Sequence, residues 1–225
     1  MTNIVVSLGG SIVAPKQGIN VKFLVGFKKL LARLSRRMRF YIVVGGGAVT
    51  RQYQKAAREV KANDIRDLDW IGIAATRLNV ELVRVCLGEM VCPIIINNPN
   101  QLPKSSKKIF IGCGWKPGWS TDYDAVLIAK NIGAKTVINL SNIDYVYDKD
   151  PKKYSEAKPI KKMHWRDLRG LVGSQWRPGF NLPFDPKACA LAALEKMSVV
   201  FLNGNNLKNF EKYLCGKGFV GTVVR

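Results

Sequence analysis

Three glycine-rich turns follow three short apolar segments, and they are the features of this sequence most able to do chemistry. They are Gly9-Gly10-Ser11, Gly45-Gly46-Gly47, and Gly112-Cys113-Gly114 with Gly118. Glycine permits positive φ and lets phosphate oxygens approach backbone N–H groups closely. A helix that starts just after such a turn adds its positive N-terminal dipole. One such turn is usually a plain tight turn, but three in 225 residues indicate a phosphate site.

Neither of the two common phosphate-binding motifs is present. No GxxxxGK[ST] loop occurs, and GCGWKPG and GGGAV do not have the spacing of a dinucleotide fingerprint. Arg51, Lys55 and Arg58 follow the second turn at helical spacing. An arginine one turn into that helix could reach a phosphate held at the helix start, although a solvated basic face would show the same pattern.

Carboxylates gather near the ends of the expected strands and the starts of the expected helices. They are Asp122, Asp124, Asp144, Asp148, Asp150 and Asp185. Phosphoryl transfer needs positive charge on the phosphates, and carboxylates orient the lysines or Mg²⁺ that supply it. Aspartate at a helix start also serves as an ordinary cap. These patterns alone predict a phosphate-binding α/β protein, with phosphotransferase as one candidate activity.

The elements that must position these residues alternate along the chain. Apolar, β-branched segments predict strands at 3–8, 39–44, 91–96, 108–112, 135–140 and 198–204, with the tail at 218–225 as an edge strand. Helical spacing predicts helices at 20–37, 48–60, 68–88, 122–133, 185–197 and 206–214. Buried strands that alternate with helices imply a three-layer α/β/α sandwich around a mainly parallel sheet.

Length and charge bound the organisation and the partners. The 225 residues suit a single domain, and the polar loop at 148–162 is too short for a free linker, so we expect one domain of two lobes. The chain has 36 Lys and Arg against 16 Asp and Glu, a net charge of +20. Such an excess favours polyanionic partners: nucleotides, phosphates, nucleic acid or acidic surfaces.

Cysteine and histidine usage argues against a built-in metal centre. The five cysteines include no CxxC pair, and His164 is the only histidine, so we expect no protein metal ligands and reduced, buried thiols. The N-terminal segment has no signal-peptide pattern, and no apolar run reaches about 18 residues. We therefore expect a cytoplasmic protein without a membrane partner.

An ordered set of motifs runs the length of the chain. They are SLGGS at 7–11, VVGGGAVTRQY at 43–53, DWIGIAATRLN at 69–79, GCGWKPGWSTD at 112–122, NLSNIDYVYDKDPKKY at 139–154 and FDPKACALA at 184–192. The most specific is the DPKKY-type segment. In this order the motifs resemble the amino-acid-kinase superfamily, and within it the uridylate (UMP) kinase family of the archaeal type.

The resemblance implies transfer of the ATP γ-phosphate to UMP, with Mg²⁺ and no covalent enzyme intermediate. It implies an acceptor lobe at about 1–133 and an ATP lobe at about 134–225. The ATP-binding positions would be Gly10, Ser11, Gly47, Arg51, Ser141, Asn142, Tyr147 and Asp150. The UMP-binding positions would be Gly46, Asp69, Trp115, Lys116, Pro117, Gly118, Trp119, Ser120 and Thr121. Asp122 matches the carboxylate that organises the transferred group, and the family implies a homo-oligomer, a hexamer.

Some residues depart from the family pattern. Ser7 stands where many relatives carry a lysine that stabilises the transferring phosphate, and Tyr145 replaces a customary glycine. Lys187 stands where acetylglutamate kinases carry a catalytic lysine. In the expected UMP-binding loop at 115–121, Trp115, Lys116 and Trp119 replace smaller or histidine-like residues. We hypothesise that Lys187 or Lys116 supplies part of the charge missing at Ser7, with Lys187 and Asp122 as the catalytic pair.

Two alternatives stay open at this point. One is a relative that phosphorylates another small acceptor, such as isopentenyl phosphate, although a substrate-binding histidine after the second turn is absent. The other is a nucleotide-binding or regulatory protein without turnover, or a nucleic-acid binder, which the +20 charge would suit. Against it, the basic residues are spread along the chain without a tail or an aromatic-basic RNA motif.

Overall fold

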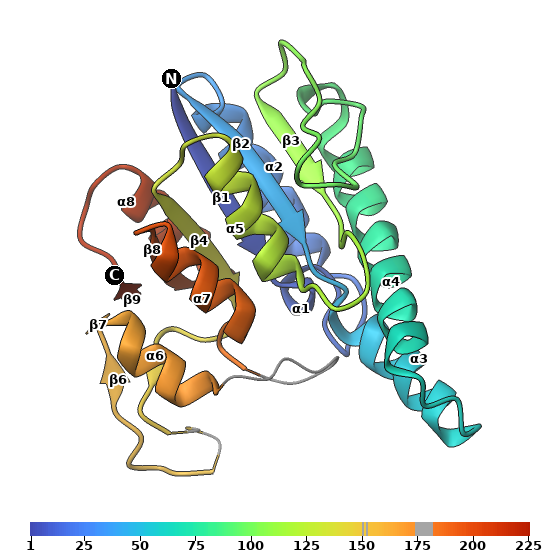
Figure 1. Cartoon of the computed structure of the whole chain (residues 1–225). Coiled ribbons are helices and arrows are strands. Elements are labelled where there is room, and N and C mark those ends of the chain that lie inside the picture. The colour runs from blue at the N-terminus through green and yellow to red at the C-terminus, as the bar shows by residue number, and fades with distance from the viewer. Residues whose placement is uncertain (150, 152, 174–181) are drawn as a thin grey trace.

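The computed structural model describes residues 1–149, 151, 153–173 and 182–225. Within this part a seven-stranded sheet has the order β3-β2-β1-β4-β8-β9-β7, with helices on both faces (Figure 1). The strands are β1 (Thr2–Leu8), β2 (Met38–Val44), β3 (Ile109–Gly112), β4 (Thr136–Ser141), β7 (Lys162–Met163), β8 (Ser198–Asn203) and β9 (Thr222–Val224). Strands β1, β2, β3, β4 and β8 are mutually parallel. The predicted α/β/α sandwich around a mainly parallel sheet is confirmed.

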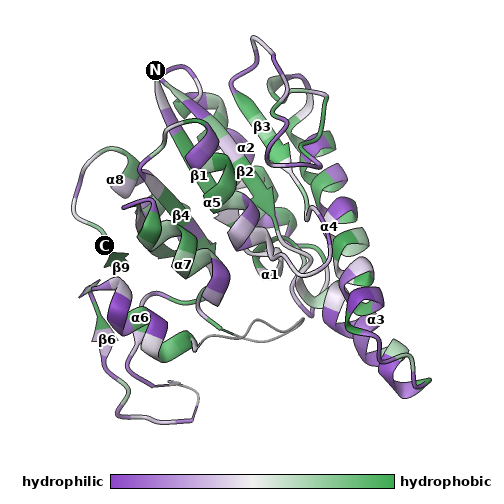
Figure 2. Cartoon of the chain, viewed as in Figure 1, coloured by the Kyte–Doolittle hydropathy of each residue, from purple (hydrophilic) through white to green (hydrophobic). Residues whose placement is uncertain are grey.

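The central strands are apolar throughout because both of their faces are buried. Val5 and Val6 are each 0% exposed, yet they belong to different cores on opposite faces of the sheet. In Figure 2 the hydrophobic colour accordingly fills the strands and the inner sides of the helices, while the outer sides are hydrophilic. The two cores fix the sheet between two helical layers.

The helices divide between the two faces. One core includes residues of α1 (Gly10–Val13), α2 (Val21–Leu34), α4 (Ile65–Leu87) and α8 (Leu207–Leu214). The other includes residues of α5 (Thr121–Asn131), α6 (Trp165–Val172) and α7 (Pro186–Leu194). Helix α3 (Gly47–Glu59) packs against α4, and the two extend beyond the sheet (Figure 1).

Polar side chains cap the starts of five helices, α2, α4, α5, α7 and α8. Asp64 Oδ1 accepts hydrogen bonds from Arg66 N at 2.7 Å and Asp67 N at 3.2 Å, so α4 starts at Ile65, three residues before the predicted position. Ser120 caps α5, and Asp185 caps α7 ahead of a proline in its first turn. Ser120 and Asp185 also bring their side chains to the site described below.

The predicted strand at 91–96 is wrong. Only its end residues, Val91 and Ile96, form single bridges to β3, and a short 3₁₀ helix (Gly88–Met90) precedes the segment. Pro93 has no backbone N–H to donate, and both Pro93 and Ile94 are exposed. The apolar residues of this segment are buried at its two ends, but the segment does not pair along its length as a strand.

The tail is a strand but not an edge. β9 is antiparallel to β8, and β7 pairs with its other side, where Val223 N donates to Lys161 O at 2.9 Å. The outer strand β7 has two residues, too few to show a sequence pattern. The same holds for the antiparallel pair β5 (Val146–Tyr147) and β6 (Pro159–Ile160).

One sheet continues across the predicted lobe boundary, because β1 pairs with both β2 and β4. The division into lobes at residue 133 stays a prediction. Among the described residues no helix combines the length and the hydropathy that crossing a bilayer requires.

Candidate active site

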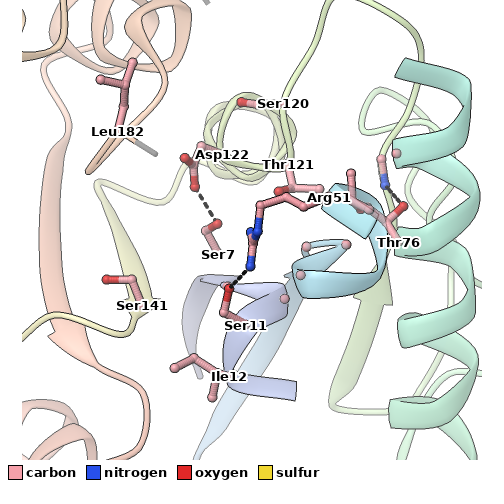
Figure 3. A pocket seen from close by; sticks show the side chains of 18 of the residues that line it. Ser7, Ser11, Ile12, Arg51, Thr76, Ser120, Thr121, Asp122, Ser141 and Leu182 are labelled. Atoms are coloured by element: carbon pink, nitrogen blue, oxygen red, sulfur yellow. Dashed lines mark hydrogen bonds between the residues drawn. The ribbon is translucent and has the colours of Figure 1, made fainter. Parts of the chain in front are cut away.

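A cavity of about 290 Å³ lies at the carboxyl ends of β1, β2 and β4, where an open α/β sheet binds its ligands. The first two glycine turns, the starts of α1, α3 and α5, and one side of α4 surround it (Figure 3). Twelve predicted site residues line it: Gly10, Ser11, Gly46, Gly47, Arg51, Asp69, Trp119, Ser120, Thr121, Asp122, Ser141 and Asn142. The fold therefore gathers residues from five separate segments at one place.

The first two glycine turns are in backbone contact. A Cβ on Gly10 would lie 2.1 Å from Gly47 N and 2.4 Å from Gly45 O. Gly47 has φ +70°, and its own Cβ would lie 2.5 Å from Gly10 O. Helix α3 begins at this point without a side-chain cap, and Ala48 N donates to Ala14 O at 3.2 Å. The other N–H groups of its first turn are available to an anion. Backbone rather than side chain thus forms the floor of the cavity.

Arg51 supplies positive charge above this floor. It lies one turn into α3, is exposed, and its Nη2 donates to Ser11 Oγ at 3.3 Å (Figure 3). Among the described residues it is the only Lys or Arg that lines the cavity. A guanidinium beside free helix N–H groups is suited to phosphate.

Asp122 faces the cavity from the first turn of α5. Its Oδ1 accepts hydrogen bonds from Ser7 Oγ at 2.7 Å and from Asn139 Nδ2 at 3.0 Å. Burial raises the pKa of Asp122 to about 7, and the charge of Asp185 adds to the increase, while the Ser7 and Asn139 hydrogen bonds lower it. The Ser7 hydroxyl therefore holds the carboxylate rather than supplying charge.

Three carboxylates anchor the loop at 115–121. Asp124 Oδ2 accepts from Trp115 N at 3.1 Å, Asp69 Oδ2 accepts from Gly118 N at 2.7 Å, and Asp185 accepts from Ser120 Oγ. Each carboxylate comes from a different element: α5, α4 and the start of α7. The loop is consequently fixed at its start, middle and end.

Two of these three carboxyl groups, Asp124 and Asp69, have raised pKa values. Burial raises the pKa of Asp124 to about 8, against the hydrogen bond from Trp115 N, and its Oδ1 has no partner among the described residues. Burial also raises the pKa of Asp69, while the Gly118 N–H and the nearby Lys187 lower it. Perturbed carboxyl groups in a cleft are typical of functional sites.

Cations and aromatic rings cover the same loop. Lys187 Nζ donates to Gly118 O at 2.8 Å and lies 5.0 Å from the Trp119 ring. Lys116 Nζ lies 4.0 Å from the Trp115 ring, and Trp119 packs on Tyr123 with ring centroids 4.2 Å apart. Of these side chains only Trp119 lines the cavity. The other predicted residues of this group do not line the cavity: Trp115, Lys116, Pro117 and Gly118, which belong to the loop, and Lys187, which donates to it.

A second cavity of about 300 Å³ adjoins the first, sharing Ser141, Asn142, Leu182 and Pro183 with it. Tyr147 lines it, and Tyr145 meets Tyr147 edge to face at 6.5 Å between centroids. Asp150 lies outside the described residues. The two cavities together could hold two ligands that meet at their shared wall.

Sequence reasoning missed several polar residues of the site. Thr50 and Gln54 line the first cavity from α3, and Asn139 lines it from within an apolar strand. The sequence does offer a signal for Asn139, because it is the only amide side chain in the apolar segment KTVINL and a buried polar group needs a hydrogen-bond partner. Gln54 lies one helical turn after Arg51, and its Nε2 donates to Leu68 O at the start of α4, a contact that local sequence does not reveal.

Comparisons with known proteins agree along the whole chain. The model of the amino acid kinase family matches residues 3–203. A uridylate kinase of Methanospirillum hungatei is 33% identical over 227 residues, covering 100% of this chain and 95% of its own. One from Thermoplasma volcanium is 33% identical, with 99% and 97% covered. The crystal structure of Archaeoglobus fulgidus uridylate kinase superimposes with a TM-score of 0.80 at 29% identity, covering 100% of both chains.

Proposed function

Because this chain belongs to the amino acid kinase family and uridylate kinases match it over its full length, we propose that it phosphorylates UMP with ATP. An oxygen of the UMP phosphate forms a bond to the γ-phosphorus, the bond to the β,γ-bridging oxygen breaks, and UDP and ADP leave. The observation that carries the proposal is the pair of adjoining cavities with a shared wall at Ser141 and Asn142.

The first cavity suits the phosphates of both substrates. Gly10, Ser11 and Gly47 would hold the ATP phosphates through backbone N–H groups, with Arg51 neutralising their charge. Gly46 would meet the UMP phosphate, and Asp69 the UMP ribose. Catalysis then depends on positioning and charge stabilisation, with no nucleophilic side chain.

The second cavity suits the rest of ATP. Ser141, Asn142 and Tyr147 would surround the base and ribose. The loop at 115–121, fixed by three carboxylates, would enclose UMP. His164 lines neither cavity among the described residues, which removes support for a histidine-bound acceptor such as isopentenyl phosphate.

Asp122 fits a nucleotide-borne Mg²⁺. Among the described residues no three His, Cys, Asp or Glu side chains group closely enough to hold a metal by themselves. Kinase Mg²⁺ is commonly held by one or two carboxylates together with substrate phosphates. Asp122 lines the cavity and receives both of its side-chain hydrogen bonds on Oδ1. When bound, Mg²⁺ would neutralise developing charge on the phosphates.

Equilibrium titration with each substrate alone tests the two-ligand arrangement. We expect UMP and a non-hydrolysable ATP analogue each to bind with one site per chain, and each to bind when the other is saturating. Mutual exclusion of the two ligands would contradict the assignment of separate cavities.

Trp119→Ala should raise KM for UMP at least about fivefold and leave KM for ATP within about twofold. Trp119 is the ring that faces the first cavity, and stacking of a base on an aromatic side chain contributes about 1–3 kcal/mol. Steady-state kinetics with each substrate varied in turn measures this, and Trp119→Phe should retain most of the affinity. An equal rise in both KM values would refute the assignment.

Lys187→Ala should lower kcat/KM for UMP about tenfold, while Lys116→Ala changes it less than about threefold. The Lys187 amine donates to Gly118 O at 2.8 Å, and a hydrogen bond from a charged group contributes about 1.5–3 kcal/mol. The Lys116 amine only covers the Trp115 ring. Lys187→Arg provides the conservative control. Unchanged turnover in both alanine variants would end the hypothesis that either lysine replaces the charge absent at Ser7.

Further properties follow the family. We propose that the protein acts in pyrimidine nucleotide synthesis in the cytoplasm and assembles as a homohexamer. Trp70, Leu78 and Val85 support assembly, because they are exposed apolar residues at spacings that place them on one side of α4. Light scattering after size exclusion measures the assembly state, and a monomer at micromolar concentration would contradict it.

A further inference from the structure

The end of the sheet opposite the cavity is strongly basic. It holds the starts of the parallel strands, and Lys or Arg precedes four of them: Arg37 at β2, Lys108 at β3, Lys135 at β4 and Lys196 near β8. Arg225 follows β9, which runs antiparallel to β8 and therefore ends at the same side. We call this surface the strand-start edge.

The cations of this edge lie side by side. Backbone hydrogen bonds join neighbouring strand starts, from Phe40 N to Lys108 O at 2.8 Å and from Ser198 N to Lys135 O at 2.9 Å. The edge segments 35–39, 104–108, 130–135, 195–197, 212–217 and 225 contain twelve Lys and Arg and one acidic residue, Glu195. The twelve are Arg36, Arg37, Arg39, Lys104, Lys107, Lys108, Lys130, Lys135, Lys196, Lys212, Lys217 and Arg225.

Few of these charges are neutralised by side chains. Glu195 pairs with Lys130 at 2.7 Å. Arg36, Arg37 and Lys217 are exposed, and none of them forms an ion pair with another described residue. The residues that are dispersed in the sequence thus become one surface in the fold.

Helix dipoles account for only part of the excess. Helices α2, α4, α5, α7 and α8 end at this side, and each C-terminus carries about half a negative charge. Five such ends offset about two to three positive charges. Glu211, which pairs with Arg33, and Glu89, whose backbone O accepts from Lys107 Nζ, lie beside these segments. The twelve cations still exceed the acidic residues, and an external polyanion would complement this excess.

A hollow interrupts the edge between α2 and α8. It has a volume of about 610 Å³, and its lining includes Arg33, Arg36, Arg37, Leu214 and Cys215. Arg33 is paired with Glu211 at 2.8 Å, which leaves the other two guanidinium groups for a ligand. Two neighbouring arginines can donate several N–H hydrogen bonds to one phosphate.

We propose that the strand-start edge binds the phosphodiester backbone of a nucleic acid without reading its bases. Neighbouring strands lie about 4.8 Å apart, so the row from β3 to β9 spans roughly 24 Å, or about seven base pairs of a duplex. The exposed aromatic residues Tyr53, Trp70 and Tyr154 lie elsewhere, so the edge offers no base-stacking platform among the described residues. Met1, directly before β1, and Leu194 are the exposed large apolar residues near it among the described residues, too few for insertion into a lipid surface.

Charge reversal separates this surface from the general charge of the protein. The edge variant is Arg36→Glu with Arg37→Glu, and the control is Lys16→Glu with Lys22→Glu, which lie at the opposite end of α2 and are also exposed. Both pairs change the net charge equally. Anisotropy of labelled 20-base-pair duplex and 20-nucleotide single-strand probes, of both DNA and RNA, measures binding at several salt concentrations.

We expect the unmodified protein to bind with Kd of order 10⁻⁶–10⁻⁴ M at physiological salt, independent of sequence. The edge variant should bind at least about tenfold more weakly, with a duplex salt slope smaller by about 1.8 for two lost phosphate contacts. The control should lose less than about threefold. Arg36→Gln with Arg37→Gln should lie between them, which guards against an effect of the introduced glutamates on folding.

Cys215 gives an independent measurement, because its exposed thiol lines the hollow. Bound nucleic acid should slow its alkylation by iodoacetamide. Equal weakening in the edge and control variants, absence of binding, or binding only to anionic phosphatidylglycerol vesicles would overturn the proposal. Turnover of UMP should persist in both variants, since none of these residues lines either cavity, so the proposal stands or falls separately from the proposed activity.

Discussion

Asp122→Asn should lower kcat by about 10²- to 10³-fold without lowering the stability of the free protein at pH 8. An asparagine Oδ1 can still accept hydrogen bonds from Ser7 Oγ and Asn139 Nδ2, so the local geometry is kept. The variant removes the negative charge that would position Mg²⁺ and the transferring phosphate. Steady-state kinetics and thermal unfolding measure the two effects, with the exposed Asp67→Asn as the control.

The raised pKa of Asp122 predicts how stability and activity depend on pH. Burial raises the pKa of Asp122 to about 7, so the folded state holds this proton more tightly than the unfolded state does. Its ionisation therefore destabilises the fold progressively from about pH 4 to pH 7, and the loss is complete above pH 7. Asp122→Asn should flatten that decline. In the unmodified protein, kcat/KM for ATP should rise up to about pH 7, because the ionised form is the active one.

A catalytic loss accompanied by an equal loss of stability would contradict this role. So would a variant that keeps a pH limb near 7 identical to that of the unmodified protein. The combination expected here, less activity with equal or greater stability, is typical of a group that is buried for function rather than for folding.

Gly10→Ala should destabilise the protein by about 3 kcal/mol and reduce activity by more than about 100-fold. The added Cβ would lie 2.1 Å from Gly47 N and 2.4 Å from Gly45 O, both backbone atoms that no side-chain rotation can move. The turns must therefore separate, which misplaces the N–H groups that would hold phosphate. Chemical denaturation and a turnover assay at a temperature where the variant is folded measure both losses.

A comparison of Gly47 with Gly88 distinguishes the effect of backbone contact from the effect of a positive φ. Gly47 and Gly88 have similar positive φ, +70° and +62°, but only Gly47 has backbone within 3 Å of its ideal Cβ. Gly88 has ψ −137°, so Gly88→Ala should cost about 1–3 kcal/mol from this positive-φ conformation alone, with activity retained. Gly47→Ala should exceed it in both losses. Equal effects at the two positions would show that the contact between the turns is unimportant.

The buried strands could be predicted because both faces of a parallel sheet demand apolar residues, as in 3–8 and 39–44. The segment 91–96 has the same composition but was buried mainly at its ends, and Pro93 prevents a continuous ladder. Strands of two residues, such as β7, and the short helix α6 depend on tertiary contacts that no local pattern carries. An apolar pattern in the sequence indicates that residues are buried, whereas the pairing of strands depends on contacts with the rest of the fold.

The glycine turns could be predicted because a backbone that must approach phosphate closely excludes side chains. Their mutual contact could not, because Gly10 and Gly47 are distant in sequence. The same limit applies to the loop at 115–121. Asp124 could be interpreted only as a helix-start residue, whereas its contact with Trp115 N fixes the loop. Its high pKa arises from burial, which spacing does not reveal.

A coupled assay of ADP formation, with Mg²⁺ and ATP and with UMP, CMP, dUMP, GMP and isopentenyl phosphate as acceptors, tests the central claim most directly. The account predicts turnover that depends on UMP, exceeds that with the other acceptors, and is lost in Asp122→Asn. Turnover with UMP no greater than the background ATPase rate, despite binding of both nucleotides, would contradict it.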